Sequence, residues 1–441
     1  MYSSSVALLS VAEADRILAG FSATPVSLWP PESVALDLAV GRFLREDIRA
    51  DRAYPAQDRS RMDGIAIVHE AWADPEKGVR SFLVTDMARA GDPRIVLSHR
   101  AAQIDHSDGN LATCVEIMTG APVPEGADTI IPYEEVTIEN RVAHVRADST
   151  VRHRQFVHAA GSDCAHDDVL VPAGARLQAA QIAVAASVGK TALQVTRRPR
   201  VAIVATGDEL VGVHETPLEH QLRVSNAHGI AALFAPWAET TVHRCGDDPE
   251  ALESLLKNVL SASDLLLVSG GVSAGKFDLV PDTLQKLGVR KVFHKLAQKP
   301  GKPLWFGSFE ATSSGSNTGT DAEETRSETL VFGLPGNPVS SLVCARRFVL
   351  PLLWAKSGGS MSAGASVPSV PLGTSVNALS RLTQYLPVQL FQSQAVPCAV
   401  NGSGDFAALG GSDGFLELPP LPPEQNHYPA GAIMAYFPWS P

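Results

Sequence analysis

The chain has 441 residues, of which 45% are hydrophobic and 19% charged. This balance excludes wholesale disorder, and the length allows about three domains. A formal net charge of −11 argues against general binding to nucleic acid or to an anionic membrane, so an anionic ligand would need a local basic pocket. The five cysteines are far apart and form no CxxC pair, which argues against a disulfide scaffold or a zinc finger.

The ends of the chain and its apolar segments indicate a soluble, cytoplasmic protein. Residues 1–5 contain no basic residue, and acids follow at Glu13 and Asp15, which is not typical of a secretory signal. The apolar segment 348–354 is far shorter than the roughly 20 residues that span a bilayer.

The N-terminal third begins with helical patterns and then becomes β-rich. Ser10 and Glu13 have the spacing of a capping box, which predicts that a helix begins there. A second amphipathic stretch covers residues 33–44. From about residue 54 to residue 157, short β-like runs alternate with Gly, Pro and Asp, which predicts a β-rich module. These runs are residues 65–68, 81–84, 129–131 and 142–145.

After Gly189, apolar strands alternate with helical segments, which predicts a doubly wound α/β domain. Glycine-rich segments at 206–209, 269–275 and 333–338 follow three of the strands, and such folds bind ligands at the carboxyl ends of strands. The expected strands are 200–205, 240–243, 264–268, 304–306 and 329–332, and the expected helices include one opened by 247–249, one over 279–287 and one from Pro338.

The C-terminal part contains two segments of different composition. Residues 311–328 have few apolar side chains and are predicted to form a disordered surface insertion between two strands. Residues 358–365 are predicted to be a linker. Beyond it, short strand signals over 367–437 predict a small all-β domain.

Three lysines form the strongest candidate site. Lys295, Lys299 and Lys302 lie within eight residues, and two prolines and a glycine restrain the loop that carries them. A solvated surface loop would explain an isolated lysine pair. The rigidity of this loop and the apolar strand beside it favour an anion site.

Two glycine-rich turns are further candidates for anion binding. Residues 269–275 (SGGVSAG) follow a strand and precede a helix, so the backbone can approach an anion closely. This segment is neither a Walker A loop nor a GxGxxG fingerprint. Residues 333–341 (GLPGNPVSS) also join a strand to a helix, where Ser340 and Ser341 supply hydroxyl groups.

Several carboxylates follow the same strand ends. Helix capping explains each of them taken alone. Their convergence beside lysines is typical of magnesium-assisted phosphoryl chemistry. They are Asp208, Glu209, Asp247, Asp248 and Asp278. The turns at 60–64 and 118–128 are polar and tight, but their composition assigns them no chemistry, and the histidines at 153, 158 and 166 match no metal motif.

Six motifs occur in an order that resembles the molybdopterin molybdenumtransferases, the MoeA family, which includes the E domain of gephyrin. The resemblance covers essentially the whole chain. The motifs are MDG at 62–64, MTGAPVPEGAD at 118–128, VAIVATGDELV at 201–211, SGGVSAGKFD at 269–278, KLAQKPGKP at 295–303 and GLPGNPVSS at 333–341.

The resemblance implies an enzyme that inserts molybdenum. It would take adenylylated molybdopterin and molybdate, release AMP and yield molybdenum cofactor with the help of magnesium. It would be a homodimer whose active site is shared between the α/β domain of one subunit and the β-rich domain of the other, and the adenylyltransferase of the same pathway is a candidate partner.

The resemblance also implies a multidomain α/β plus β fold. The domains would be a segmented linker domain (1–54 and 158–198), an inserted β-rich domain (55–157), a doubly wound molybdopterin-binding α/β domain (199–357) and a C-terminal β-barrel (358–441).

Residues carried over from the family fall into three groups. The catalytic group is Asp63, Thr119, Glu209, Asp247, Asp278, Lys295 and Lys299. The group that would bind substrate is Gly270, Gly271, Ser273, Lys302, Pro335, Gly336, Pro338, Ser340 and Asp163. Asp247 and Asp278 would position magnesium, and Lys302 and Ser340 would contact molybdate.

The chain departs from the family pattern at three places. Glu116 stands where an arginine is usual, Ala159 and Ala160 replace a basic stretch before Asp163, and Ile65 replaces an aromatic residue. Two alternatives are a scaffold that kept the fold and lost the chemistry, and the related adenylyltransferase. The intact lysine loop argues against the first, and the β-rich insertion and C-terminal domain argue against the second.

Overall fold

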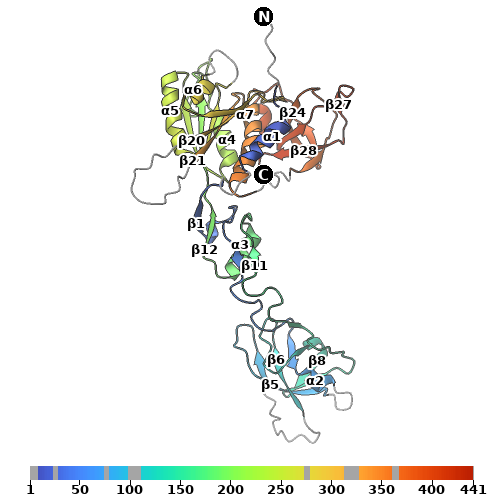
Figure 1. Cartoon of the computed structure of the whole chain (residues 1–441). Coiled ribbons are helices and arrows are strands. Elements are labelled where there is room, and N and C mark those ends of the chain that lie inside the picture. Colours follow the sequence, from blue (N-terminus) through green and yellow to red (C-terminus); the bar gives the residue numbers. More distant parts are fainter. Residues whose placement is uncertain are drawn as a thin grey trace, which may run out of the picture. The chain divides into compact units, whose positions relative to one another are not determined.

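A computed structural model describes residues 8–22, 28–73, 79–97, 111–272, 279–311, 327–359 and 367–440 (Figure 1). The chain forms two compact units. Unit 1 comprises Met1–Glu46, Ala173–Ile182 and Thr191–Pro441, and unit 2 comprises Asp47–Pro172 and Ala183–Lys190.

A six-stranded sheet with the order β16-β13-β17-β21-β20-β18 forms the centre of unit 1. Its first four strands are parallel, whereas β20 and β18 run antiparallel to their neighbours. The five strands predicted for this region are present, and β18 is a sixth that was not predicted. The strands are β13 (Arg200–Thr206), β16 (Glu239–Cys245), β17 (Leu265–Ser269), β18 (Arg290–His294), β20 (Trp305–Ala311) and β21 (Ser327–Leu334).

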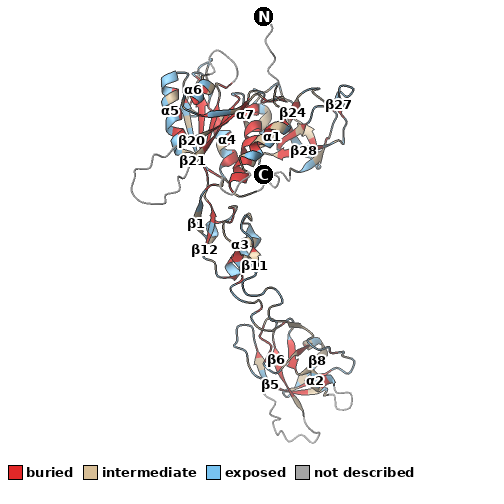
Figure 2. Cartoon of the chain, viewed as in Figure 1, coloured by how far each residue is buried: buried red, intermediate tan, exposed pale blue. Residues whose placement is uncertain are grey.

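Helices cover both faces of this sheet, which confirms the predicted α/β layering. Ile203 of β13 belongs to the core cluster with α4 (Asn226–Phe234) and α7 (Pro338–Cys344). The next residue, Val204, belongs to the cluster with α5 (Pro249–Ala262) and α6 (Val280–Lys286). Buried side chains therefore occupy both faces of the strands. Figure 2 colours much of this sheet as buried.

The C-terminal strands form a second six-stranded sheet, as the all-β pattern predicts. Its order is β19-β24-β26-β28-β22, with β25 paired to β24, so the hydrogen-bonded path has two open ends and the sheet is a half-barrel. Its strands are β19 (Gln298–Lys299), β22 (Ser369–Pro371), β24 (Thr383–Phe391), β25 (Gln394–Pro397), β26 (Gly414–Leu418) and β28 (Ile433–Pro438), with β23 (Val376–Asn377), β27 (His427–Tyr428) and α9 (Ala407–Gly410) beside them.

The first helix, α1 (Val11–Gly20), begins where the capping box predicts. The Ser10 hydroxyl accepts a hydrogen bond from the backbone N–H of Glu13, and the Glu13 carboxylate accepts one from the backbone N–H of Ser10. The buried face of α1 joins the same core cluster as α8 (Leu350–Lys356).

The amphipathic stretch predicted over 33–44 does not form a continuous helix. It contains the end of β1 (Pro31–Ala35) and the short helix η2 (Leu36–Leu38). The apolar residues at 34, 36, 38 and 40 also alternate with period two, which fits a strand. Antiparallel pairing with β12 (Ala192–Thr196) supplies the backbone hydrogen bonds and selects the extended form.

Unit 2 is β-rich, as predicted, around a sheet with the order β7-β4-β6-β5-β9-β8. The sequence pattern predicted four of these six strands and missed β6 and β8. They are β4 (Gly64–Ile67), β5 (Ser81–Ala88), β6 (Ala112–Ile117), β7 (Thr129–Pro132), β8 (Val136–Glu139) and β9 (Val142–Val145). Around them lie β2 (Ile48–Arg49), β3 (Arg59–Ser60), β10 (Val157–His158), β11 (Val169–Val171), α2 (His69–Ala73) and η3 (Tyr133–Glu135); α3 (Ala179–Ser187) begins in unit 1 and ends in unit 2.

The predicted insertion at 311–328 and linker at 358–365 are only partly covered by the structure. Residues 312–326 and 360–366 lie outside the described residues. Ala311 ends β20 and Glu328 belongs to β21, so the predicted insertion extends one or two residues too far at each end.

Candidate active site

A cavity of about 1000 Å³ lies in unit 1 beside the carboxyl ends of the parallel strands. Three of the lining segments follow β13, β17 and β21, which are neighbours in the sheet. Because parallel strands end at the same edge, their following loops meet there. The lining residues from these loops are Thr206, Gly207, Glu209, Gly270, Gly271, Val272, Pro335, Gly336 and Asn337.

Gly270 shows why these turns contain glycine. Its φ is +101°, and a Cβ atom at this position would lie 2.6 Å from the carbonyl oxygen of Thr206. Any larger residue would collide with the end of β13. The absence of a side chain leaves the backbone of β17 close to the cavity, as the anion-binding interpretation requires.

The lysine loop forms another wall of the cavity. Lys299 and Lys302 line it, whereas Lys295 is not among the lining residues. The buried side chain of Gln298 donates from Nε2 to the carbonyl oxygen of Gly301 at 2.8 Å and holds the turn between the two lysines. Two of the three lysines singled out in the sequence therefore line the cavity.

The carboxylates at the strand ends include Glu209 and Asp247, which both line the cavity. The backbone N–H of Asp247 donates to the Asp208 carboxylate at 2.9 Å, and the N–H of Asp208 lies 3.4 Å from the Asp247 carboxylate. Asp248 instead caps α5 by accepting from the N–H of Ala251. Burial raises the pKa of the nearby Cys245 thiol, and the carboxylates of Asp248, Asp247 and Asp208 raise it further.

The start of α7 contacts the C-terminal domain at this cavity. Ser340 and Ser403 both line it. The carbonyl oxygen of Ser403 accepts from the backbone N–H of Val339 at 3.2 Å, and its hydroxyl accepts from Asn337 Nδ2 at 2.7 Å. Pro338 is the first residue of α7 and fixes the direction in which the helix starts.

Nine lining residues from the C-terminal domain could not be found from sequence motifs. The only link is structural: Gln298 and Lys299 form β19, which pairs in parallel with Thr383 and Gln384 of β24. This pairing brings an all-β domain against the lysine loop. The nine residues are Leu379, Leu382, Gln384, Tyr385, Leu386, Pro387, Val400, Gly402 and Ser403.

Two predicted residues, Ser273 and Asp278, lie outside the described residues. The described residues can be tested as ligands for magnesium. No group of three or more acidic, histidine or cysteine side chains suited to a metal occurs in the part of the chain that the structure describes. Magnesium is usually held by one or two carboxylates together with substrate phosphates and water. Glu209 and Asp247 on the cavity wall fit that arrangement.

Unit 2 contains the other predicted catalytic pair. The Asp63 carboxylate accepts from the backbone N–H of Thr119 at 2.6 Å and from its hydroxyl at 2.8 Å. These hydrogen bonds lower the pKa of Asp63, which keeps the carboxylate charged. Asp163 lies elsewhere in unit 2, where its carboxylate is 2.8 Å from Nε2 of His158.

Comparisons with known proteins cover nearly the whole chain. Residues 9–189 match the MoeA N-terminal region (domain I and II), and residues 202–355 match a probable molybdopterin binding domain. The molybdopterin molybdenumtransferase of Synechocystis is 35% identical over 93% of this chain and 96% of its own length. The chain belongs to the molybdopterin molybdenumtransferase family.

Other members of this family are similarly related. The molybdopterin molybdenumtransferase of Bacillus subtilis is 30% identical over 88% of this chain and 86% of its own length. Gephyrin of Dictyostelium discoideum is 30% identical over 74% of this chain, a match that covers 47% of gephyrin. The molybdopterin biosynthesis MoeA protein of Pyrococcus horikoshii shares the fold, with a TM-score of 0.74 at 22% identity over 98% of this chain and all of that structure.

Glu116, at one of the expected departures from the family pattern, has a hydrogen-bond partner in unit 2. The Tyr133 hydroxyl donates to the Glu116 carboxylate at 2.5 Å. Burial raises the pKa of Tyr133, and the negative charges of Glu116 and Asp63 raise it further. Glu116 therefore adds negative charge near the Asp63–Thr119 pair.

In the part of the chain that the structure describes, one apolar helical stretch, Pro338–Lys356, is long enough to cross a membrane. It comprises α7, η4 (Ala345–Val349) and α8. Because 78% of its apolar window is buried inside the protein, it serves as a core helix of unit 1.

Proposed function

We propose that this chain inserts molybdenum into adenylylated molybdopterin, releases AMP and yields molybdenum cofactor. The observation that carries the proposal is the cavity in which Lys299 and Lys302 face the glycine-rich ends of three parallel strands. It occurs in a chain that matches a named molybdopterin molybdenumtransferase over 93% of its length.

The cavity has the charges that two anionic substrates need. Lys299 and Lys302 would neutralise the phosphate groups and the molybdate, since a lysine ammonium group forms strong hydrogen bonds with oxyanions. Gly270 and Gly271 would let the phosphates approach the backbone, and Ser340 would donate its hydroxyl to molybdate. Local cations of this kind offset the net charge of −11 that would otherwise repel both substrates.

The chemistry would be positioning and electrostatic stabilisation. A water or molybdate oxygen would attack the adenylyl phosphorus and break the phosphoanhydride bond, with the phosphate of molybdopterin as the leaving group. Attack by water gives AMP directly, and an adenylyl–molybdate formed by attack of molybdate gives AMP on hydrolysis. The protein would contribute by holding both substrates in line and by stabilising the charge that develops on the phosphate oxygens. Pro335, Gly336 and Pro338 would fix the loop against which the pterin nucleotide lies.

Magnesium would be held by Asp247 and Asp278, with Glu209 as a further oxygen donor on the cavity wall. When bound, it would supply positive charge to the phosphate oxygens. The backbone N–H of Asp208 would hold the Asp247 carboxylate in place, and that carboxylate would also orient the bound substrate.

The active form would be a cytoplasmic homodimer. Asp63 and Thr119 would act on substrate bound by the partner subunit, and Asp163 would support the same region. Lys295 would act beside Lys299 on the lysine loop. The adenylyltransferase of the same pathway would deliver the adenylylated substrate. The intact lysine loop and cavity favour this activity over a scaffold that has lost its chemistry.

The test is release of AMP by purified protein given adenylylated molybdopterin, magnesium and molybdate. We expect molybdate-dependent AMP release, and we expect Lys299→Ala to reduce its rate about 100-fold, as loss of one charge-stabilising contact does. Lys291→Ala is the control, because Lys291 is an exposed lysine that does not line the cavity. Unchanged release in Lys299→Ala would refute the role of this lysine, and no release by the unaltered protein would refute the activity.

A further inference from the structure

A second, much smaller cavity lies in unit 1, away from the lysine loop. Its volume is about 20 Å³, which is enough for one small occupant. It lies between the segment around β12 and the end of α8. The lining residues are Gly41, Arg42, Phe43, Thr196, Arg197, Arg198, Pro236, Trp237, Trp354 and Ser357.

Four of these ten residues contain a buried polar atom without a hydrogen-bond partner. The atoms are Thr196 Oγ1, Arg198 Nε, Trp237 Nε1 and Trp354 Nε1. Three of them are N–H groups, which can only donate. Buried polar groups are nearly always paired, so a local group of unpaired donors indicates an occupant that accepts hydrogen bonds.

A fifth donor lies against the same two tryptophans. The guanidinium of Arg176 stacks on the rings of Trp237 and Trp354, with its central carbon 4.5 Å and 5.4 Å from their centroids. Its Nε is also buried without a partner. Burial lowers the pKa of Arg176, which shows that its positive charge is poorly solvated.

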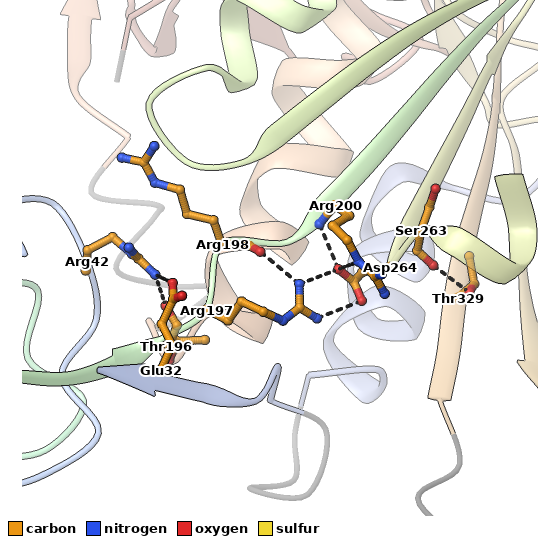
Figure 3. A network of polar contacts seen from close by, with 9 residues as sticks. All are labelled: Glu32, Arg42, Thr196, Arg197, Arg198, Arg200, Ser263, Asp264 and Thr329. Carbon is orange, nitrogen blue, oxygen red and sulfur yellow. Dashed lines mark hydrogen bonds and ion pairs between the residues drawn. The ribbon is translucent and has the colours of Figure 1, made fainter. Parts of the chain in front are cut away.

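The arginines around this cavity carry more positive charge than the carboxylates paired with them can balance. Arg42 pairs with Glu32 and donates to the carbonyl oxygen of Thr196 at 2.6 Å (Figure 3). Arg197 forms two hydrogen bonds with Asp264, at 2.8 and 2.9 Å.

Arg198 contributes its carbonyl oxygen to this network, whereas its guanidinium extends away from it (Figure 3). Neither Arg198 nor Arg176 forms an ion pair with any residue that the structure describes. Two guanidinium groups therefore remain uncompensated beside the cavity.

We propose that this cavity binds one monovalent, chloride-sized anion between the Arg198 guanidinium and the indole N–H groups of Trp237 and Trp354. Water would also satisfy the donors, but only an anion would balance the positive charge of the two half-buried guanidinium groups that have no ion-pair partner among the described residues. A tetrahedral oxyanion is too large for a cavity that admits one or two water-sized spheres. The site is separate from the catalytic cavity and does not rest on the proposed function.

The anion would stabilise the folded chain by binding it selectively. It would join β12 and residues 41–43 to the end of α8, and all of these groups separate on unfolding. A ligand that binds only the native state stabilises it by RT ln(1 + c/Kd), where c is the free concentration of the ligand, so the unfolding temperature rises with that concentration.

The experiment compares thermal unfolding of the full chain in sodium chloride and in sodium gluconate at equal ionic strength. We expect the transition in chloride to lie about 2–4 °C higher. Bromide should reproduce the increase and sulfate should not. Equal transition temperatures in chloride and gluconate would overturn the proposal.

Two variants and one control test whether an increase in the unfolding temperature in chloride arises from this cavity. Arg198→Gln and Trp237→Phe each remove one donor group, so the difference between chloride and gluconate should disappear in both. Trp305→Phe is the matched control, because Trp305 Nε1 is also buried without a partner but Trp305 belongs to the core beneath the α/β sheet. Trp305→Phe should keep the difference in unfolding temperature between chloride and gluconate.

A direct readout is the line width of the chloride-35 NMR signal in the presence of the protein. The unaltered protein and Trp305→Phe should broaden it, and Arg198→Gln should not. Broadening that persists in Arg198→Gln, or a chloride effect on stability that persists in both cavity variants, would show that chloride acts elsewhere and would refute the site.

Discussion

Gly301 determines how the two cavity lysines are held. Its φ is +94°, and a Cβ atom there would lie 2.6 Å from Cys344 Sγ and 2.7 Å from Gln298 Nε2. The same amide group of Gln298 holds the Gly301 carbonyl oxygen. The turn between Lys299 and Lys302 is therefore packed directly onto a buried amide and a buried thiol, whose pKa burial raises to about 12.

We expect Gly301→Ala to lower the free energy of unfolding by about 2–4 kcal/mol, the sum of a left-handed backbone cost and an overpacking cost. Urea unfolding measures it. Gly288→Ala is the matched control, because Gly288 also has a positive φ, +89°, but its Cβ would have only Phe309 within reach, at 3.8 Å. An equal loss in both variants would contradict the packing argument.

Asp264 makes the stability of unit 1 depend on pH. Burial alone would raise the pKa of its carboxyl group, but hydrogen bonds from Arg197 and Arg200 outweigh burial and lower it. The unfolded chain then binds a proton more readily than the folded chain does. The stabilisation is therefore present above the ordinary aspartate pKa of about 3.9 and is lost as the pH falls through the lower folded value.

Asp264→Asn should remove part of this acid dependence and lower the free energy of unfolding near pH 7 by about 3 kcal/mol, because it breaks a largely buried pair. Denaturant unfolding at several pH values between 3 and 7 measures both effects. An unchanged slope against pH below 4 would refute the role of this carboxyl group.

At the scale of single elements, β13, β17 and β21 of the α/β sheet were predictable because each is a buried apolar run bounded by glycine or charge. β18 was not predicted, and only one of its five residues is buried. β1 was not predictable. The apolar residues of this stretch fit both the helical period and the two-residue period of a strand, and only the pairing with β12, about 160 residues away, selects the strand. The cavity wall from the C-terminal domain was not predictable for a similar reason. It depends on two residues, Gln298 and Lys299, pairing with β24, and no local pattern marks so short a strand.

Arg347 shows how one side chain joins three elements. From the η4 segment it forms two hydrogen bonds with Asp15 of α1, each 2.8 Å, and one of 2.5 Å with Glu417 of β26. Burial opposes its charge, but these carboxylates raise the pKa of Arg347 well above its ordinary value. The three elements are therefore held by a buried cation.

Arg347→Met should lower the free energy of unfolding by about 3–5 kcal/mol, since it leaves Glu417 largely buried without its partner. Arg16→Met, at an exposed position of α1, is the control and should change it by less than about 0.5 kcal/mol. Chemical denaturation compares the two variants. A loss in Arg347→Met no larger than that of the control would show that the carboxylates find other partners.

At the scale of the whole molecule, the proposed activity needs residues from both units. Lys299 lines the cavity of unit 1, and the Asp63–Thr119 pair lies in unit 2. If the active form is a homodimer with a shared site, each active site takes one group from each subunit. The two groups can then be inactivated in different chains.

Asp63→Ala and Lys299→Ala should each be inactive alone, and a mixture in which subunits exchange should regain up to about one quarter of the unaltered activity. Half of the molecules in a random mixture are mixed dimers, and each of these has one intact site. AMP release after co-refolding or co-expression measures the recovery. Absence of recovery in confirmed mixed dimers would favour a site within one chain.

The short strand β19 determines whether part of unit 1 can be excised without disturbing the lysine loop. Its two residues belong to the lysine loop, yet they form the edge of the sheet that the last seventy residues build. An α/β domain excised from this chain would keep its Gly-rich turns but would leave Lys299 on an unpaired edge. The lysine loop therefore depends on both six-stranded sheets of unit 1, and neither sheet could be moved into another protein with the shape of the loop intact.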